Sequence, residues 1–197
     1  MIFLSMRKIL LFLLLFPVFL YGQNREEVYF ENSIFKGVYS EVLEQPLWVE
    51  YTVQCPDGSA SRKGMDFYTN DSIHTSDGKD YAHNIYDKGH LAPAADFNCT
   101  RDMLYMTFSY LNCALQDQYL NRGTWRLLEA YERELSAHCN VSVRIEVDFK
   151  NKDNTLPTGA TVPTGFYKYI THNGTTEIFY FDNVKPESSD YMLYKIN

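Results

Sequence analysis

The strongest constraint on the fold is a strict alternation of apolar and polar residues over 141–147, VSVRIEV. Valine or isoleucine fills every second position, and serine, arginine and glutamate stand between them. Successive side chains of a strand point to opposite faces, so this segment predicts a strand with one buried face. Residues 47–53 alternate in a similar way, and shorter strands are expected at 65–68, 162–170 and 177–181.

A helical pattern precedes the strand at 141–147 and runs from Gln116 to about His138. Its apolar side chains form one stripe with charged residues between them: Leu120, Trp125, Leu127, Leu128, Tyr131 and Leu135. Gly123 is a weak point near its start, because glycine inside a helix costs about 1 kcal/mol relative to alanine. Strands on both sides of one long helix predict an α+β domain with a mainly antiparallel sheet.

The start of the chain has the character of a secretory signal peptide spanning residues 1–22. Arg7 and Lys8 precede an apolar run over 9–20, and the small residue Gly22 offers a cleavage point. The run is shorter than the roughly 20 residues of a membrane-spanning helix. We therefore expect a secreted or periplasmic protein, with one domain over residues 23–197 and no membrane anchor after cleavage.

The formal charge of the chain narrows the range of functions. It is −7 for all 197 residues, and removing Arg7 and Lys8 takes −7 to −9. A protein that holds nucleic acid mainly through a broad basic surface is therefore not expected. An enzyme that binds a phosphodiester locally remains compatible with this charge.

Cys55, Cys99, Cys113 and Cys139 are the cysteines of the chain. In an exported protein two disulfides are expected, and four cysteines allow three connectivities. Our prediction pairs Cys99 with Cys113 and Cys55 with Cys139. A zinc site is the competing interpretation, but neither a CxxC nor an HxxxH spacing is present.

The segment 84–97, NIYDKGHLAPAADF, places a histidine beside residues suited to phosphate chemistry. Gly89 lets a ligand approach the backbone closely, and Lys88 offers a cation to a phosphate. Asp87 can orient a neighbouring side chain, and His90 can act as a general base. A surface turn is the alternative interpretation of this segment alone.

The helical pattern also carries polar residues on one face. Asn121 and Glu129 are eight residues apart, little more than two helical turns, so their side chains point in similar directions. An amide oxygen and a carboxylate on one face can hold a hydrated hard cation. The alternatives are that Asn121 caps the helix and that Glu129 forms a solvated pair with Arg133.

Together these segments resemble the DNA/RNA non-specific endonucleases of the ββα-metal type, which include secreted bacterial nucleases and the endonuclease G group. The resemblance rests on DKGHLAPAADF, on TFSYLN and on LNRGTWRLLE, and it covers roughly residues 47–181. The family has an Asp-Arg-Gly-His box followed by Ala-Pro and, about thirty residues later, an asparagine-containing helix. His90 and Asn121 match that separation.

The resemblance implies a ββα-metal nuclease fold, with a long metal-site helix packed on the sheet, and a role for each matching residue. His90 is expected to be the general base, and Asn121 the direct protein ligand of Mg²⁺, with Mn²⁺ as an alternative ion. Glu129 is expected to hold metal-bound water, and Arg62 to contact phosphate. Lys88 stands where the family usually has arginine and is expected to share in catalysis and in substrate binding.

Further candidate positions complete the predicted site. Arg122 is expected to bind substrate, and the remaining polar positions are expected to order the site: Asp87, Asn112 and Gln116. The sequence departs from the family pattern at Lys88, at Leu115, where proline is common, and at the C-terminus, which ends where relatives usually continue into another helix.

The leading hypothesis is a secreted, Mg²⁺-dependent endonuclease that hydrolyses DNA and RNA with little sequence specificity. A histidine with an ordinary pKa near 6.5 can accept a proton at neutral pH, and Mg²⁺ can stabilise the leaving oxygen. The alternative is a non-catalytic secreted binding module on a degenerate nuclease fold. A structural protein stapled by disulfides, with no Mg²⁺ site, is a third possibility.

Overall fold

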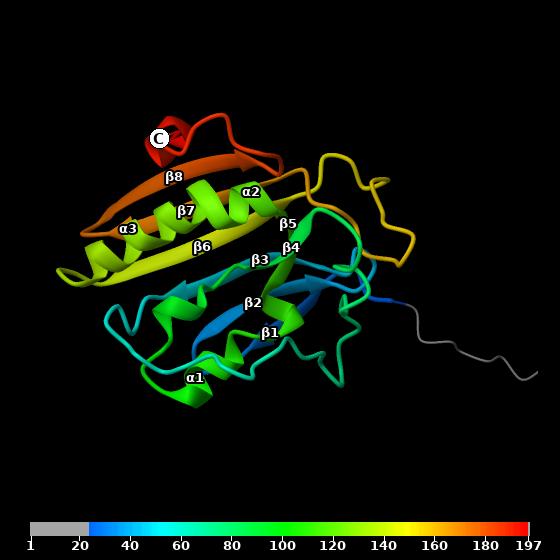
Figure 1. Ribbon diagram of the computed structural model, residues 1–197, viewed down its shortest axis with the longest axis horizontal. Coiled ribbons are helices and arrows are strands. Elements are labelled where there is room, and N and C mark those ends of the chain that lie inside the picture. The colour runs from blue at the N-terminus through cyan, green and yellow to red at the C-terminus, as the bar shows by residue number, and fades with distance from the viewer. Residues whose placement is uncertain (1–23, 197) are drawn as a thin grey trace, which may run out of the picture.

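The computed structural model describes residues 24–196, so the predicted signal peptide lies outside the described part (Figure 1). Its main element is a six-stranded antiparallel sheet with the strand order β1-β2-β3-β6-β7-β8. The strands are β1 (Val28–Glu31), β2 (Phe35–Ser40), β3 (Gln45–Thr52), β6 (Val141–Asp148), β7 (Gly165–His172) and β8 (Thr175–Asp182). Between residues 24 and 196, no helix is long and apolar enough to cross a membrane.

Strand β6 confirms the alternation seen in the sequence. Val141, Val143, Ile145 and Val147 are buried, while the residues between them are partly exposed. β6 pairs with β3 on one side and with β7 on the other, so it lies in the middle of the sheet. The predicted strands at 47–53, 162–170 and 177–181 correspond to β3, β7 and β8, with ends shifted by a few residues.

A second, two-stranded sheet carries the histidine motif. It consists of β4 (Tyr86–His90) and β5 (Cys113–Asp117), paired antiparallel with His90 opposite Cys113. His90 therefore ends a strand and does not lie in a surface turn. The prediction of a strand at 65–68 is wrong, because this segment makes one isolated bridge, from Tyr68 to Ser109.

Two short segments join these strands. Helix α1 spans Arg101–Met106, and a 3-10 turn covers Tyr110–Asn112 before β5 begins. Most of residues 103–111 are buried, as their apolar and aromatic character predicts, although Tyr105 on α1 is 46% exposed.

The predicted long helix follows β5 directly but is interrupted. Asp117 caps helix α2 (Gln118–Leu120) by accepting hydrogen bonds from the backbone of Tyr119 and Leu120. A π-helical segment at Asn121–Trp125 then leads into helix α3 (Arg126–Ser136). The helix begins two residues later than predicted because Gln116 belongs to β5. Gly123 has non-helical dihedral angles, so the predicted weak point is the place where the helix breaks.

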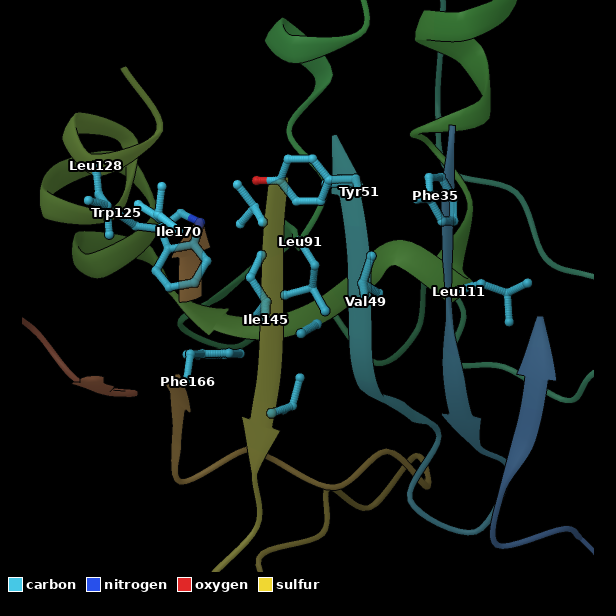
Figure 2. Close-up of a cluster of buried hydrophobic side chains, with 14 of the residues drawn as sticks. Phe35, Val49, Tyr51, Leu91, Leu111, Trp125, Leu128, Ile145, Phe166 and Ile170 are labelled. Carbon is cyan, nitrogen blue, oxygen red and sulfur yellow. The ribbon is translucent and has the colours of Figure 1, made fainter. Parts of the chain in front are cut away.

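Helix α3 lies over β6 and β7 (Figure 1) and is fixed there by aromatic contacts. The ring of Trp125 lies 5.6 Å from that of Phe166 on β7 and 5.7 Å from that of Phe181 on β8. Figure 2 shows Trp125 and Leu128 facing the sheet, in the same core as Leu91, which follows β4. Strands β4 and β5 and the helical segment that follows them therefore pack together on the main sheet.

The disulfide differs from both predicted pairs. Cys55 is bonded to Cys99, while Cys113 and Cys139 are free. The backbone N–H of Cys55 donates to the carbonyl of Asp96, which brings the segments after β3 and before α1 together. Cys113 is buried in β5, where its thiol contacts the hydroxyl of Tyr81 at 3.3 Å, so it is not available to Cys99.

Candidate active site

One cleft of about 750 Å³ brings most of the predicted site residues together. Its walls come from β4, the helical segment around α3 and the loops at 62–67 and 93–95. The sequence-predicted residues that line it are Arg62, Asp87, Lys88, His90, Asn121, Arg122 and Glu129. Asn112 and Gln116 are fully buried behind it and do not line it.

His90 is held in the cleft by aromatic rings. Its imidazole lies 4.7 Å from the ring of Phe67 and 4.9 Å from that of Phe108. The Nε2 atom is buried and has no hydrogen-bond partner among residues 24–196. Burial of the ring, with a further contribution from the charge of Arg62, lowers the pKa of His90 to about 3. The ring is therefore neutral, with an unprotonated nitrogen, at neutral pH.

Gly89 is required by close packing between β4 and β5. A Cβ atom on Gly89 would lie 2.6 Å from the Cβ of Gln116 and 3.2 Å from the carbonyl oxygen of Ala114. The side chain of Gln116 thus lies against the backbone next to His90. This contact fixes the end of β4. The sequence led us to expect that Gly89 lets a ligand approach the backbone, whereas in the structure it is Gln116 that approaches.

Asn112 fixes the turn that follows His90. Its Oδ1 accepts a hydrogen bond from the backbone N–H of Ala92 at 2.7 Å. Its Nδ2 donates to the carbonyl oxygens of Ala92 and Thr107 at 2.9 and 3.0 Å. Because Asn112 has no exposed surface, these bonds are made in the interior and hold the backbone on the C-terminal side of His90.

Asn121 is oriented by a carboxylate from β4. Its Nδ2 donates to Oδ2 of Asp87 at 2.9 Å. Arg122 binds the same carboxylate through two hydrogen bonds, of 2.8 and 2.6 Å. The amide nitrogen is thus engaged by Asp87, whereas the Oδ1 oxygen of Asn121 accepts no hydrogen bond from the described residues. The N-terminus of the helical segment is capped by Asp117 and not by Asn121, which lies at the C-terminal end of α2.

Glu129 lines the same cleft from helix α3. Burial raises the pKa of its carboxyl to about 7, against the opposing charges of Lys168 and Arg133. It does not form the pair with Arg133 that was the alternative interpretation, because Arg133 donates to the buried Asp96 at 2.9 Å. Glu129 therefore carries a carboxylate whose protonation changes near neutral pH.

Basic side chains are concentrated in this cleft, although the protein is acidic overall. Five of them line it: Arg62, Lys88, Arg122, Arg126 and Arg133. The sequence reasoning did not select Arg126, and it considered Arg133 only as a partner of Glu129. Helical spacing is the signal that was available for both, because Arg122 and Arg126 are four residues apart and Arg133 lies seven beyond.

The donor atoms of the cleft fit a hard divalent cation. The amide oxygen of Asn121 and the carboxylates of Glu129 and Asp87 are oxygen ligands of the kind that Mg²⁺ and Mn²⁺ take. Between residues 24 and 196, no group of three or more histidine, cysteine or acidic side chains is arranged to hold a metal ion. A cation here would keep several waters, as Mg²⁺ usually does.

Comparison with known proteins decides the family. The sequence model described as DNA/RNA non-specific endonuclease matches residues 19–193. The chain belongs to the DNA/RNA non-specific endonuclease family. Mitochondrial endonuclease G of Bos taurus is 33% identical over 128 residues, which are 57% of this chain and 43% of that protein. The nuclease of Serratia marcescens is 27% identical over 169 residues, 76% of this chain and 62% of that protein.

A solved structure supports the same family. A chain of the EndoG/EndoGI complex superposes with a TM-score of 0.76 at 25% identity, over 86% of this chain and 80% of that one. The predicted α+β fold, with its mainly antiparallel sheet and a long helix packed on it, is thereby confirmed. The chain spans about half the length of the curated relatives it matches.

Proposed function

We propose that this family member is an exported, metal-dependent endonuclease that hydrolyses phosphodiester bonds of DNA and RNA with little sequence specificity. The observation that carries the proposal is that His90 and Asn121, far apart in the sequence, line one cleft rich in arginine. A histidine base, an oxygen ligand for a cation and several phosphate-binding groups are the parts that this reaction requires.

His90 is the proposed general base. Its ring is neutral at neutral pH, so its nitrogen can take a proton from a water molecule beside the phosphate. A pKa of about 3 describes the protein without substrate, and an anionic phosphate next to the ring raises the pKa by stabilising the imidazolium. Phe67 and Phe108 keep the ring in place while it acts.

Asn121 is the proposed direct ligand of Mg²⁺, and Glu129 the group that holds its water. When bound, the ion supplies Lewis-acid stabilisation of charge on the phosphate and on the leaving oxygen, worth several kcal/mol. Asp87 contributes by holding the Asn121 amide, so that its oxygen and not its nitrogen is offered to the ion.

The arginines are the proposed phosphate contacts. Arg62 and Arg126 line the cleft, and both side chains are exposed. Arg122 and Arg133 are each held by a carboxylate, Asp87 and Asp96, which fixes their geometry. Contacts to phosphate carry no base information, so cleavage with little sequence preference is the expected result.

The protein is proposed to be exported to an oxidising compartment. The disulfide between Cys55 and Cys99 suits an oxidising compartment. The apolar run near the start of the chain supports a signal peptide, with cleavage after Gly22. The relatives include both mitochondrial nucleases and a bacterial nuclease, so family membership alone leaves the compartment open.

The proposal is tested by incubating the purified protein with plasmid DNA and with RNA, in Mg²⁺ or in EDTA. We expect cleavage of both in Mg²⁺ and none in EDTA. His90→Ala should reduce the rate about 10²–10⁴-fold, the range for loss of a general base, while the exposed His138→Ala, as control, should not. A folded wild-type protein that binds nucleic acid but never cuts it would favour the non-catalytic binding module.

A further inference from the structure

An exposed carboxylate is bound to the lysine that stands next to the proposed general base. Lys88, two residues before His90 on β4, donates from Nζ to Oδ1 of Asp66 at 3.0 Å. The Lys88 side chain is 27% exposed and that of Asp66 is 83% exposed. Lys88 therefore lines the cleft, while Asp66, which does not line it, lies on the solvent side of the lysine.

The ammonium group is held firmly by its surroundings. It lies 5.5 Å from the ring centres of both Phe67 and Tyr110. Burial lowers the pKa of Lys88, but hydrogen bonding to Asp66 and to the Tyr110 hydroxyl more than offsets this, and the pKa is raised. Lys88 is thus a fixed positive charge that lines both the catalytic cleft and an adjoining hollow of about 510 Å³.

Asp66 differs from the other carboxylates that bind cleft cations. Asp87 also holds the Asn121 amide, and Asp96 is fully buried beneath Arg133, so both have structural tasks. Asp66 belongs to a loop, and its remaining hydrogen bond is to the backbone N–H of its neighbour Phe67. Exposed ion pairs of this kind contribute little to stability, so Asp66 can be displaced from Lys88 at small cost.

We propose that Asp66 occupies the position of a substrate phosphate on Lys88 and sets the affinity of the cleft for nucleic acid by competing for that lysine. This inference rests on the proposed function of the same site. Like a phosphate, the carboxylate offers anionic oxygens to the ammonium group. A phosphate that enters the cleft must displace Asp66 or share Lys88 with it, and in both cases the acidic side chain weakens binding.

The competition predicts a specific gain on removing one charge. Asp66→Asn keeps the shape of the side chain and an oxygen that can accept from the Phe67 N–H, but it removes the negative charge of the carboxylate. Nucleic-acid binding should tighten about two- to fivefold, the range expected when an exposed ion partner is lost. The salt dependence of binding should steepen, by up to about one unit in the logarithmic slope, as Lys88 becomes a full phosphate contact.

The test is fluorescence anisotropy of a short labelled duplex DNA with the full protein in EDTA, so that binding is measured without cleavage. Four proteins form a double-mutant cycle: wild type, Asp66→Asn, Lys88→Gln and the double variant. Asp66→Asn should tighten binding only where Lys88 is present. Asp77→Asn is the matched control, since Asp77 lines the adjoining hollow but approaches Lys79 and not Lys88. Circular dichroism checks that each variant is folded.

Four results would overturn the inference. An equal gain from Asp66→Asn with and without Lys88, or the same gain from Asp77→Asn, would mean that only net charge matters. If the wild type binds and cleaves nucleic acid but Asp66→Asn does not bind it more tightly, the proposed function stands and the competition is rejected. A wild type that neither binds nor cleaves would reject both.

Discussion

Two aromatic rings hold the imidazole of His90, whose Nε2 has no hydrogen-bond partner among the described residues. A ring held in this way is free of a carboxylate that would stabilise its charged form. Its protonation is therefore governed by burial and by the positive charge of Arg62, which both favour the neutral state. The ring is therefore expected to be neutral at neutral pH.

The titration of His90 is a direct prediction at this scale. We expect its imidazole to titrate with a midpoint near 3 in the folded protein without substrate. Because the folded pKa lies below the unfolded value near 6.5, its contribution to stability is full above pH 6.5 and is lost as pH falls toward 3. Imidazole proton shifts in an NMR titration, assigned with His90→Gln, measure this. A midpoint near 6.5 in the folded protein would show that burial does not control the ring.

The sequence selected the main residues of the site but not all of its cations. His90, Asn121 and Glu129 were found because short motifs, and the family they resemble, identify them at fixed spacing. Helical spacing relates Arg126 and Arg133 to Arg122, but it does not show that this side of the helix lines the cleft, because that depends on how the helix packs on the rest of the protein.

At the scale of elements, the contact between β4 and β5 determines where His90 lies. Gly89→Ala would place a methyl group 2.6 Å from the Cβ of Gln116, so the two strands must separate. We expect a loss of about 1–3 kcal/mol in the free energy of unfolding, typical of overpacking, together with reduced cleavage. Denaturant unfolding and the cleavage assay measure the two effects.

Gly78→Ala provides a matched control for this substitution, because its new methyl group would meet only the Tyr110 hydroxyl, at an ordinary 3.6 Å. It should leave stability within about 0.5 kcal/mol of wild type, as most surface substitutions do. If Gly89→Ala were equally mild, the packing of Gln116 against β4 would not be what positions His90.

Elements were predictable where hydrophobic periodicity is strong. The apolar residues of β6 recur every two positions and those of α3 about every 3.6 positions, and each element buries its apolar face against the other. β5 was missed because residues 113–117 are buried on both faces, which removes the alternation, and Gln116 and Asp117 read as the start of a helix. β4 has mixed polar composition and is a strand because β5 pairs with it.

At the scale of the whole molecule, the disulfide joins the segment that follows β3 to the segment that precedes α1. Cys55 and Cys99 are 44 residues apart, so the bond restricts a large loop of the unfolded chain. Replacing both with serine should lower the free energy of unfolding by about 2–4 kcal/mol. Cys139→Ser is the control, because Cys139 is free and should contribute far less.

Peptide mapping under non-reducing conditions tests the same connectivity independently. We expect one linked pair, Cys55 with Cys99, and alkylation of Cys139 in the native protein. A bond that includes Cys113 would contradict the buried position of its thiol in β5. Sequence alone could not choose among the connectivities, because the choice depends on which loops meet after the sheet has formed.

The central claim is that His90 and Asn121 act in one site, with separate roles around a divalent cation. It is tested most directly by the cleavage rate as a function of Mg²⁺ concentration for wild type, Asn121→Ala and His90→Ala. Asn121→Ala should raise the Mg²⁺ concentration for half-maximal rate at least about tenfold. His90→Ala should lower the maximal rate about 10²–10⁴-fold and leave the half-maximal concentration unchanged. Wild-type Mg²⁺ dependence in Asn121→Ala, with full activity in His90→Ala, would contradict the account.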